Sequence, residues 1–372
     1  MIRSIMHRAF FIVVFCCASF GIVRAQDYII NLKQYGIEEG LSHREVNCIV
    51  KDNQGFLWLG TPFGLNRFDG YTFKWWTKEK DGLPNNHIQS LAIDAAGDLW
   101  IFQSSIRIGF YSAQSISVLD TEQGTLIPIE EKLGSAIPVP VQEIGGTVVK
   151  DESNTLFFGT GNGARMLTYH PDKGMSVFPL DTFTTFMPRG VSTRQTIWGI
   201  ANDNSLLEVS SEGQILHTYH HPNNLSWRTA VVIGDEVLFE GNKHDGAIIF
   251  YKIDENGKLL ELTDAQLPIS ARQLNQKVKQ LNYDSSHERL WMVSKELLPI
   301  VDWDKGKLLN FYDEYPHLIR DRGIGWRGIL FEPSGDAWLG GDFGLYQISI
   351  QQNKFSHYLF EKTWGDETLT TK

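Results

Sequence analysis

The chain has 372 residues and a formal net charge of −10 at pH 7, and 12% of its residues are aromatic, including 11 Trp. An acidic protein repels phosphate backbones and anionic lipid surfaces at long range, so the charge disfavours nucleic acid and membrane surfaces as partners. Of three cysteines, Cys16 and Cys17 lie in the amino-terminal segment, which leaves Cys48 alone and excludes a disulfide framework.

The amino-terminal segment, up to Ala25, has the layout of a secretory signal peptide. A basic patch precedes the apolar run "AFFIVVFCCASFGIV", and Val23-Arg24-Ala25 follows before the polar "QDY". We therefore expect residues 1–25 to be a signal peptide and the mature protein, beginning at Gln26, to be periplasmic. The alternative is an uncleaved anchor helix. No later stretch is long and apolar enough to predict a membrane span.

A motif that follows the amino-terminal segment recurs along the chain. "VNCIVKDNQGFLWLGT" at residues 46–61 aligns with "IQSLAIDAAGDLWIFQ" at residues 88–103: apolar residues, Asp, a turn with Gly, then Trp. Each copy is followed by further short alternating strands separated by turn residues such as Asp69-Gly70. The aromatic residue of the motif recurs at similar intervals, as Trp58, Trp100, Phe157, Trp198, Phe239, Trp291 and Trp338.

Seven copies, each with room for four strands, predict an all-β fold: a seven-bladed β-propeller with four-stranded antiparallel blades. The alternative is a sandwich or a series of unrelated hairpins. We expect the motif aromatics to pack between blades, and Asp52 and Asp94 to close the turns before their glycines. One propeller is predicted over residues 26–372, with a tail at 361–372 and blades at roughly 40–80, 82–122, 140–180, 188–221, 225–263, 274–313 and 322–360.

The sequence offers two segments for the outer strand of the last blade and so does not decide how the ring closes. "KFSHYLF" at residues 354–360 is the expected outer strand of the last blade. "YIINLKQYG" at residues 28–36 also has the pattern of an outer strand. It either pairs with the last blade and closes the ring, or belongs with a partner domain.

The first two copies resemble the two-component regulator propeller repeat of Bacteroidetes hybrid two-component sensors. The first copy carries the pattern at Gly40, Leu41, Ser42, Asp52, Gly55, Leu57, Trp58, Gly60, Thr61, Gly64, Leu65, Asp69 and Gly70. The second keeps Gly82, Leu83, Pro84, Asp94, Gly97 and Trp100. The resemblance implies the periplasmic ligand-sensing region of a hybrid two-component regulator, in which the signal is usually an oligosaccharide. Because the chain has no kinase or output domains of its own, we expect a truncated or stand-alone form of such a sensor.

Candidate ligand residues lie where loops lead into the innermost strands. Trp227-Arg228 and Trp326-Arg327 occupy the same position in two blades, and such pairs are suited to stack on a sugar and bind its hydroxyls, a uronate or a sulfate. The alternative is that the Trp residues pack between blades and the Arg residues pair with carboxylates. The predicted ligand-binding residues are Arg44, His87, Arg189, Trp227, Arg228, Arg272, Lys279, Arg322, Trp326 and Arg327.

No catalytic constellation, metal site or cofactor site is predicted. "HTYHH" at residues 217–221 has ligand-like spacing without carboxylates beside it, and we expect solvated imidazoles there. The first hypothesis is thus a non-enzymatic sensor whose partners are an oligosaccharide and adjoining propeller or sensor domains or a second copy, with no membrane contact beyond the signal peptide. The alternatives are a propeller glycoside hydrolase or lyase, and a protein-interaction module.

Overall fold

The computed structural model describes residues 28–104, 115–160, 165–180, 185–201, 203–221, 227, 229–242, 248–262, 278, 280–293, 298–309 and 325–352. The predicted signal peptide and carboxyl-terminal tail lie outside the described residues. The chain divides into two compact units. One comprises Asn31–Ser349 and contains the ring of blades; of the other, Met1–Ile30 with Ile350–Lys372, the described residues are in strands.

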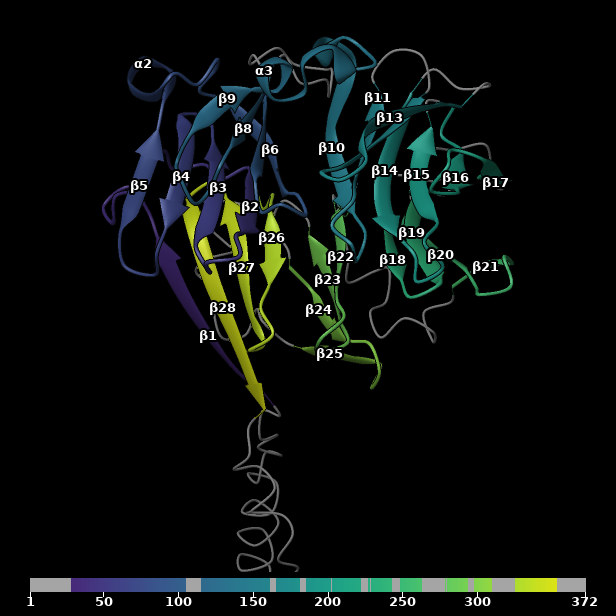
Figure 1. The fold of residues 1–372 in the computed structure, drawn as a ribbon. Helices are drawn as coiled ribbons and strands as arrows, with labels where there is room; N and C mark the ends of the chain where they lie inside the picture. Colours follow the sequence, from purple (N-terminus) through teal and green to yellow (C-terminus); the bar gives the residue numbers. More distant parts are fainter. Residues whose placement is uncertain are drawn as a thin grey trace, which may run out of the picture. The chain divides into compact units, whose positions relative to one another are not determined.

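The strands form seven four-stranded antiparallel sheets, which confirms the predicted seven-bladed propeller (Figure 1). Blade 1 consists of β2 (Cys48–Lys51), β3 (Leu57–Thr61), β4 (Gly64–Phe68) and β5 (Phe73–Trp76). Blade 2 consists of β6 (Ile88–Ile93), β7 (Leu99–Gln103), β8 (Ser115–Leu119) and β9 (Leu126–Pro128). Blade 3 consists of β10 (Ile144–Lys150), β11 (Leu156–Thr160), β12 (Arg165–His170) and β13 (Gly174–Pro179).

Blades 4 to 6 repeat the same order. Blade 4 consists of β14 (Phe186–Val191), β15 (Ile197–Ala201), β16 (Leu206–Val209) and β17 (Ile215–Tyr219). Blade 5 consists of β18 (Thr229–Ile233), β19 (Glu236–Asn242), β20 (Ile248–Ile253) and β21 (Leu259–Glu261). Blade 6 consists of β22 (Gln280–Asp284), β23 (Arg289–Val293), β24 (Ile300–Asp302) and β25 (Lys307–Leu309). The first strand of each blade is innermost, and in most blades it contacts the first strand of the next blade.

Blade 7 combines strands from the two ends of the chain. It holds β26 (Ile329–Phe331), β27 (Asp336–Gly341) and β28 (Gly344–Gln352), and β1 (Tyr28–Tyr35) is its outermost strand, beside β28. Of the two options for the amino-terminal segment, pairing with the last blade is therefore the observed one. The segment expected to fill this position, residues 354–360, lies outside the described residues.

The closing strand is held by aromatic packing. Tyr35 is 6% exposed, and its ring centroid lies 4.9 Å from that of Phe68 in blade 1 and 5.9 Å from that of Trp338 in blade 7. Its hydroxyl donates to Gln347 Oε1 at 3.4 Å. Because the chain's first strand completes the last blade, the covalent chain itself resists opening of the ring at this point.

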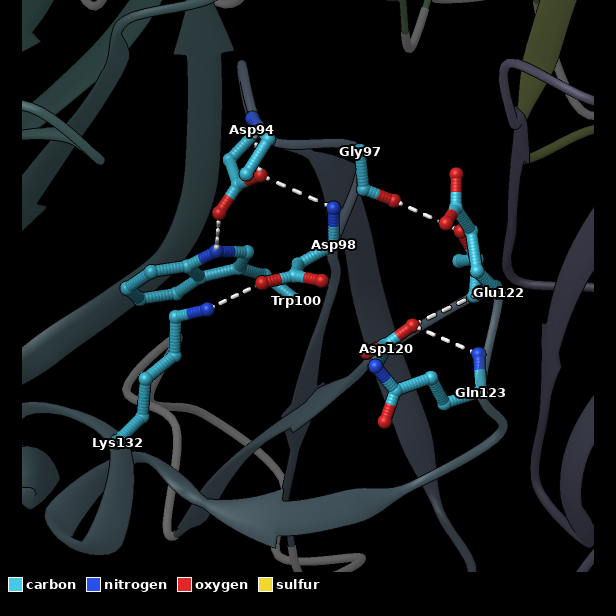
Figure 2. Close-up of polar contacts among 10 residues, drawn as sticks. Asp94, Gly97, Asp98, Trp100, Asp120, Glu122, Gln123 and Lys132 are labelled. Carbon is cyan, nitrogen blue, oxygen red and sulfur yellow. Dashed lines mark hydrogen bonds and ion pairs between the residues drawn. The ribbon is translucent and has the colours of Figure 1, made fainter.

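The repeated Asp does more than close the turn, as Figure 2 shows for blade 2. Asp94 Oδ1 accepts hydrogen bonds from the backbone N–H groups of Ala96 at 2.9 Å and Asp98 at 3.0 Å. Its other oxygen, Oδ2, accepts one from the indole N–H of Trp100 at 2.9 Å. Asp94 and Trp100 are 1% and 0% exposed, so one buried carboxylate satisfies the turn and the buried indole together.

We call this arrangement, in which one Asp accepts from two turn amides and from the motif indole, the carboxylate–indole lock. Blade 1 has the same lock, whereas blades 3 and 4 each lack one of its parts. Asp52 Oδ1 accepts from two turn amides at 2.9 Å, and Oδ2 accepts from the indole of Trp58 at 2.7 Å. Blade 3 keeps the Asp but has Phe157 in place of the indole, and blade 4 has Ser192 in place of the Asp. Trp198 in blade 4 accordingly has no hydrogen-bond partner for its Nε1 within the part of the chain that the structure describes.

The motif aromatics pack between blades, as predicted. Trp58 joins an apolar cluster with Ile88, Leu91 and Ile101 of blade 2. Trp100 packs against Tyr169 in blade 3, with ring centroids 4.5 Å apart. Each of these aromatics thus contributes to the interface with the following blade, and burying such a large ring stabilises the contact.

Two departures from the predicted layout occur in the interval between blades 2 and 3. The outer strand β9 extends to Pro128, beyond the expected end of blade 2 at residue 122, and helix α3 (Ile129–Leu133) follows it. Two 3-10 helices, Gly134–Ala136 and Val141–Glu143, then lead to β10. The remaining helix described, α2 (Lys78–Asp81), links blades 1 and 2. None of the described helices has the length and apolar character needed to cross a membrane.

Candidate functional site

Five polar side chains gather at the end of the ring where the innermost strands of blades 7, 1 and 2 begin. This is the upper end in Figure 1, where α2 and α3 lie. The five residues come from the loop before β2, the position before β6, the segment before β26 and the β27–β28 turn. This group, called the upper cluster below, consists of Glu45, Asn47, His87, Arg327 and Asp342.

Arg327 is the centre of the upper cluster. Its Nε and Nη2 donate to Asp342 Oδ1 at 3.1 and 2.9 Å, and its Nη1 donates to Asn47 Oδ1 at 3.1 Å. Glu45 supplies a second carboxylate, with Oε2 3.3 Å from Nη2. Asn47 extends the contacts to blade 2, because its Nδ2 donates to the carbonyl oxygen of Ile88 at 2.9 Å. The guanidinium therefore links blades 7 and 1 and is balanced by two carboxylates.

His87 supplies a neutral ring beside this guanidinium. Its Nδ1 lies 3.0 Å from Ser104 Oγ, and its backbone N–H donates to Asn85 Oδ1 at 3.0 Å. Burial lowers the pKa of His87, the positive charge of Arg327 lowers it further, and the carboxylate of Glu45 acts in the opposite direction. At neutral pH the imidazole is uncharged, and because Nδ1 is bonded to Ser104 only Nε2 is available to a ligand, as a donor or as an acceptor.

The charges of the upper cluster determine which ligands suit it. With His87 neutral, one guanidinium faces two carboxylates, so the five residues carry a net negative charge and present donors and acceptors together. Such a set suits the hydroxyl groups of an uncharged sugar. It does not favour the uronate or sulfate that the sequence also suggested, because an anion would approach Glu45 and Asp342 as well as Arg327.

An aromatic shelf lies at the same end of blade 1 and was not predicted. Phe63, in the β3–β4 turn, is 46% exposed, and its ring centroid is 6.2 Å from that of the half-buried Trp75. Lys80 in α2 places its Nζ 4.5 Å from the Trp75 ring centroid. The shelf, defined as Phe63 and Trp75, has the aromatic surface on which sugar rings stack. The signal in the sequence is the aromatic Phe63 within the turn "TPFG" at residues 61–64.

The structure brings together some of the predicted residues. His87 and Arg327 lie in the upper cluster. Arg44 lies in the same loop as Glu45 and Asn47, with its guanidinium carbon 5.7 Å from the ring centroid of Phe343. Arg189 lies in the innermost strand of blade 4, where the register shifts between Pro188 and Gly190. Four other predicted residues lie outside the described residues: Arg228, Arg272, Lys279 and Arg322.

Trp227 and Trp326 are both buried, and Trp227 joins a cluster with Trp198 of the preceding blade, as in the alternative that has these Trp residues pack between blades. Trp227 is 3% exposed and its ring centroid lies 4.4 Å from that of Phe239. Trp326 is 4% exposed and its ring centroid lies 5.0 Å from that of Tyr346. Neither ring offers a face to a ligand, so sugar stacking on these two residues is not supported by their placement.

The histidines of "HTYHH" have separate partners. His217 Nδ1 lies 2.8 Å from Glu208 Oε2, and His220 Nδ1 lies 2.9 Å from Ser205 Oγ. His221 is 3% exposed and packs on the ring of Trp227, so the expectation of a solvated imidazole is wrong for this residue. The three imidazoles therefore face different neighbours, and no metal-binding group of His, Cys, Asp and Glu is found among the residues that the structure describes.

Comparisons with known proteins agree with the repeat. The family model described as "Two component regulator propeller" matches residues 40–63 and 82–102, which span the motif in blades 1 and 2. A curated relative, histidine kinase P4 of Formosa agariphila, is 44% identical over 52 residues, which are 14% of this chain and 4% of the kinase. The resemblance seen in the sequence is thus confirmed for the repeat, and the match covers a small part of the kinase.

Solved structures with the same fold include sensors and enzymes. The extracellular domain of a putative hybrid two component system from B. thetaiotaomicron has a TM-score of 0.61 and 16% identity, covering 86% of this chain and 41% of that one. A streptogramin B lyase has a TM-score of 0.63 and 14% identity, covering 87% of this chain and 98% of that one. At such low identity these likenesses establish the propeller fold and do not distinguish the two functions.

Proposed function

Because the chain carries repeats of the two component regulator propeller family, we propose that it is an extracytoplasmic sensor propeller of a hybrid two-component regulator. In this proposal it binds an oligosaccharide at its upper end and does not cleave it. The observation that carries the proposal is the combination of the upper cluster with the aromatic shelf. Both lie at the end where propellers usually bind ligands, and one supplies hydrogen bonds while the other supplies stacking.

The composition of the upper cluster supports binding without catalysis. A glycoside hydrolase needs two carboxyl groups flanking the scissile bond, one of them free to donate a proton. Here Asp342 and Glu45 both contact the same guanidinium, so each carboxylate is engaged in holding Arg327. A second candidate function, that of a lyase or hydrolase, is favoured by no particular group of described residues.

Export and domain partners belong to the same proposal. The amino-terminal segment has a signal-peptide pattern, and proteins with this fold include extracellular domains of two-component systems. A ligand would act by favouring one of two arrangements of this unit and adjoining sensor domains or a second copy. Kinase and output activity would come from other domains of the regulator.

The test is calorimetric titration of the chain from residue 26 with a panel of neutral oligosaccharides, followed by chromatography of each sugar. Saturable binding with intact sugar is expected. Trp75→Ala should weaken it by about tenfold or more, since stacking and lost burial together contribute about 1.5 kcal/mol or more. Tyr71→Ala is the matched control, because Tyr71 is 90% exposed and lies in the β4–β5 turn at the other end of blade 1. Cleaved sugar would overturn the proposal in favour of an enzyme.

A further inference from the structure

A second set of hollows lies at the opposite end of the ring, where the innermost strands finish. A mainly apolar hollow of about 260 Å³ is lined by Val50, Lys51, Leu91, Ile93, Lys150 and Leu330 among others. These residues come from the innermost strands of blades 7, 1, 2 and 3. We call it the lower hollow. It is independent of the upper cluster, whose residues lie where the same strands begin.

Lys150 also lines a neighbouring, more polar hollow. That space, of about 380 Å³, is bordered by residues from the ends of the innermost strands of blades 3 to 6, including Thr193 and Tyr283. No hydrogen bond of the Tyr283 hydroxyl is found among the described residues. Lys150 is thus the one residue shared by the two spaces, with mainly apolar walls on one side and, on the other, hydroxyl groups together with the acidic residues Asp151 and Glu152.

Within the described residues, Lys150 lacks the ion pair that Lys51, at the equivalent position of blade 1, forms with a carboxylate. The two lysines hold the same register, since Lys51 pairs with the residue before Trp58 and Lys150 with the residue before Phe157. Lys51 Nζ forms an ion pair with Glu332 of the preceding blade at 2.7 Å.

The carboxylate at the equivalent position for Lys150 is bonded to other groups. Glu332 stands six residues before the motif aromatic of blade 7, and the corresponding residue of blade 2 is Asp94. Asp94 is 1% exposed and is bound to the Trp100 indole and two turn amides. Lys150 Nζ instead donates to the Asn154 side-chain oxygen at 2.8 Å, and no carboxylate of the described residues forms an ion pair with it.

The side chain of Lys150 lies against neighbouring strands that line the lower hollow. Burial by the neighbouring strands lowers the pKa of Lys150, with no carboxylate to offset the effect. Two nearby acidic residues do not supply one: Asp151 Oδ1 accepts from Thr155 N–H and Ser153 Oγ at 2.8 and 2.7 Å, and Glu152 is exposed in the following turn. Lys150 is an exposed residue despite these neighbouring strands, so it is accessible to an incoming anion.

We propose that the lower hollow binds a small carboxylate with an apolar body, its carboxylate paired with Lys150 Nζ and its body against Val50, Leu91 and Leu330. A neutral sugar would leave the ammonium unpaired and bury hydroxyls against aliphatic walls, at a cost in free energy. An inorganic anion would pair with Lys150 and leave the apolar walls unfilled. An amphipathic carboxylate satisfies both features, because its charge pairs with the ammonium while its apolar body covers the aliphatic walls.

The probe is phenylacetate, with phenylacetamide as its uncharged analogue, titrated into the whole chain in a carboxylate-free buffer. Phenylacetate is expected to bind saturably and at least about threefold more tightly than the amide, since an exposed ion pair contributes up to about 1 kcal/mol. Lys150→Met should remove this preference. Lys258→Met, in the exposed β20–β21 turn, is the matched control and should leave both affinities unchanged.

A second readout uses the unaltered protein and so does not depend on the variant folding. Brief acetic anhydride treatment followed by mass spectrometry reports the accessibility of each lysine amine, and phenylacetate should protect Lys150 while leaving Lys258 unprotected. Equal affinity for the acid and the amide, unchanged affinity in Lys150→Met, or an unprotected Lys150 at saturating phenylacetate would each overturn the proposal. Oligosaccharide binding at the upper cluster should be the same in Lys150→Met, so the two proposals fail separately.

Discussion

Replacing Asp94 with Ala is expected to destabilise the ring far more than removal of an ordinary turn carboxylate. Asp94 Oδ1 and Oδ2 accept three hydrogen bonds, two from turn amides and one from the indole N–H of Trp100. The matched control is Asp120→Ala in the same blade. Asp120 Oδ1 also accepts from two turn amides, those of Glu122 and Gln123 at 2.9 and 2.8 Å, but no indole (Figure 2).

The difference between the two variants can be worked out from burial. The turn amides are near solvent in both cases, so their loss costs about 0.5–1 kcal/mol each after water replaces the carboxylate. The Trp100 indole is 0% exposed, and leaving its N–H without an acceptor adds a cost of about 2–3 kcal/mol. The free energy of unfolding should therefore fall by about 3–5 kcal/mol in Asp94→Ala and by about 1–2 kcal/mol in Asp120→Ala.

Urea unfolding followed by Trp fluorescence measures both values, and a double-mutant cycle isolates the lock. Trp100→Phe removes the indole N–H, so Asp94→Ala in that background should cost about 2 kcal/mol less than in the unaltered chain. Blade 3 has the natural counterpart of the Trp100→Phe variant, because it combines Asp151 with Phe157. Independent sites typically add to within about 0.5 kcal/mol, so a smaller coupling energy than this would refute the assigned role of the carboxylate. Equal destabilisation by Asp94→Ala and Asp120→Ala would refute it too.

Three further outcomes are expected. Tyr35→Ala should lower the free energy of unfolding by about 3–5 kcal/mol, because it removes a buried ring from the closing strand, whereas Tyr35→Phe should lower it by about 1 kcal/mol or less. Gly159→Ala should cost about 2 kcal/mol or more in urea unfolding, because a Cβ there overlaps the carbonyl oxygen of Phe186 in the next blade; near-neutral behaviour would contradict that close approach. Arg327→Gln should raise the pKa of His87 in an NMR titration, because it removes a nearby positive charge. Since the folded-state pKa lies below the ordinary value, the contribution of this histidine to stability declines as the pH falls, and the variant should decline less; a pKa that falls would be the opposite result.

Much of the fold follows from local patterns. The spacing of Trp58, Trp100 and the later aromatics predicts seven copies, and Asp-Gly or Lys-Gly turns predict the hairpins within each. These signals suffice because a blade is built from neighbours in sequence. The partner of β1 does not follow from the sequence, because β1 and β28 are far apart along the chain. No local pattern distinguishes pairing with the last blade from pairing with a partner domain.

The candidate site was predicted less completely, for a geometric reason. The sequence identifies Arg327 as a ligand residue, and its guanidinium does meet a polar side chain of the next blade, Asn47. The sequence also identifies Trp326, the residue before Arg327, yet consecutive residues of an extended segment point to opposite sides, and Trp326 points into the core. Asp342 was missed because its partner lies 15 residues earlier, across a hairpin that brings the turn back beside the segment before β26.

The distribution of the carboxylate–indole lock bears on how such a sensor would work. The blades in which the complete lock is described, 1 and 2, are those that the family model matches, and together with blade 7 they carry the upper cluster. Side chains on closely packed, fully hydrogen-bonded blades keep their geometry when a ligand binds. Binding energy is then not spent on reordering these blades. For the proposed sensor, we expect the change to occur where adjoining domains meet this unit, because a ligand held at the upper cluster would favour the arrangement in which those domains also contact it.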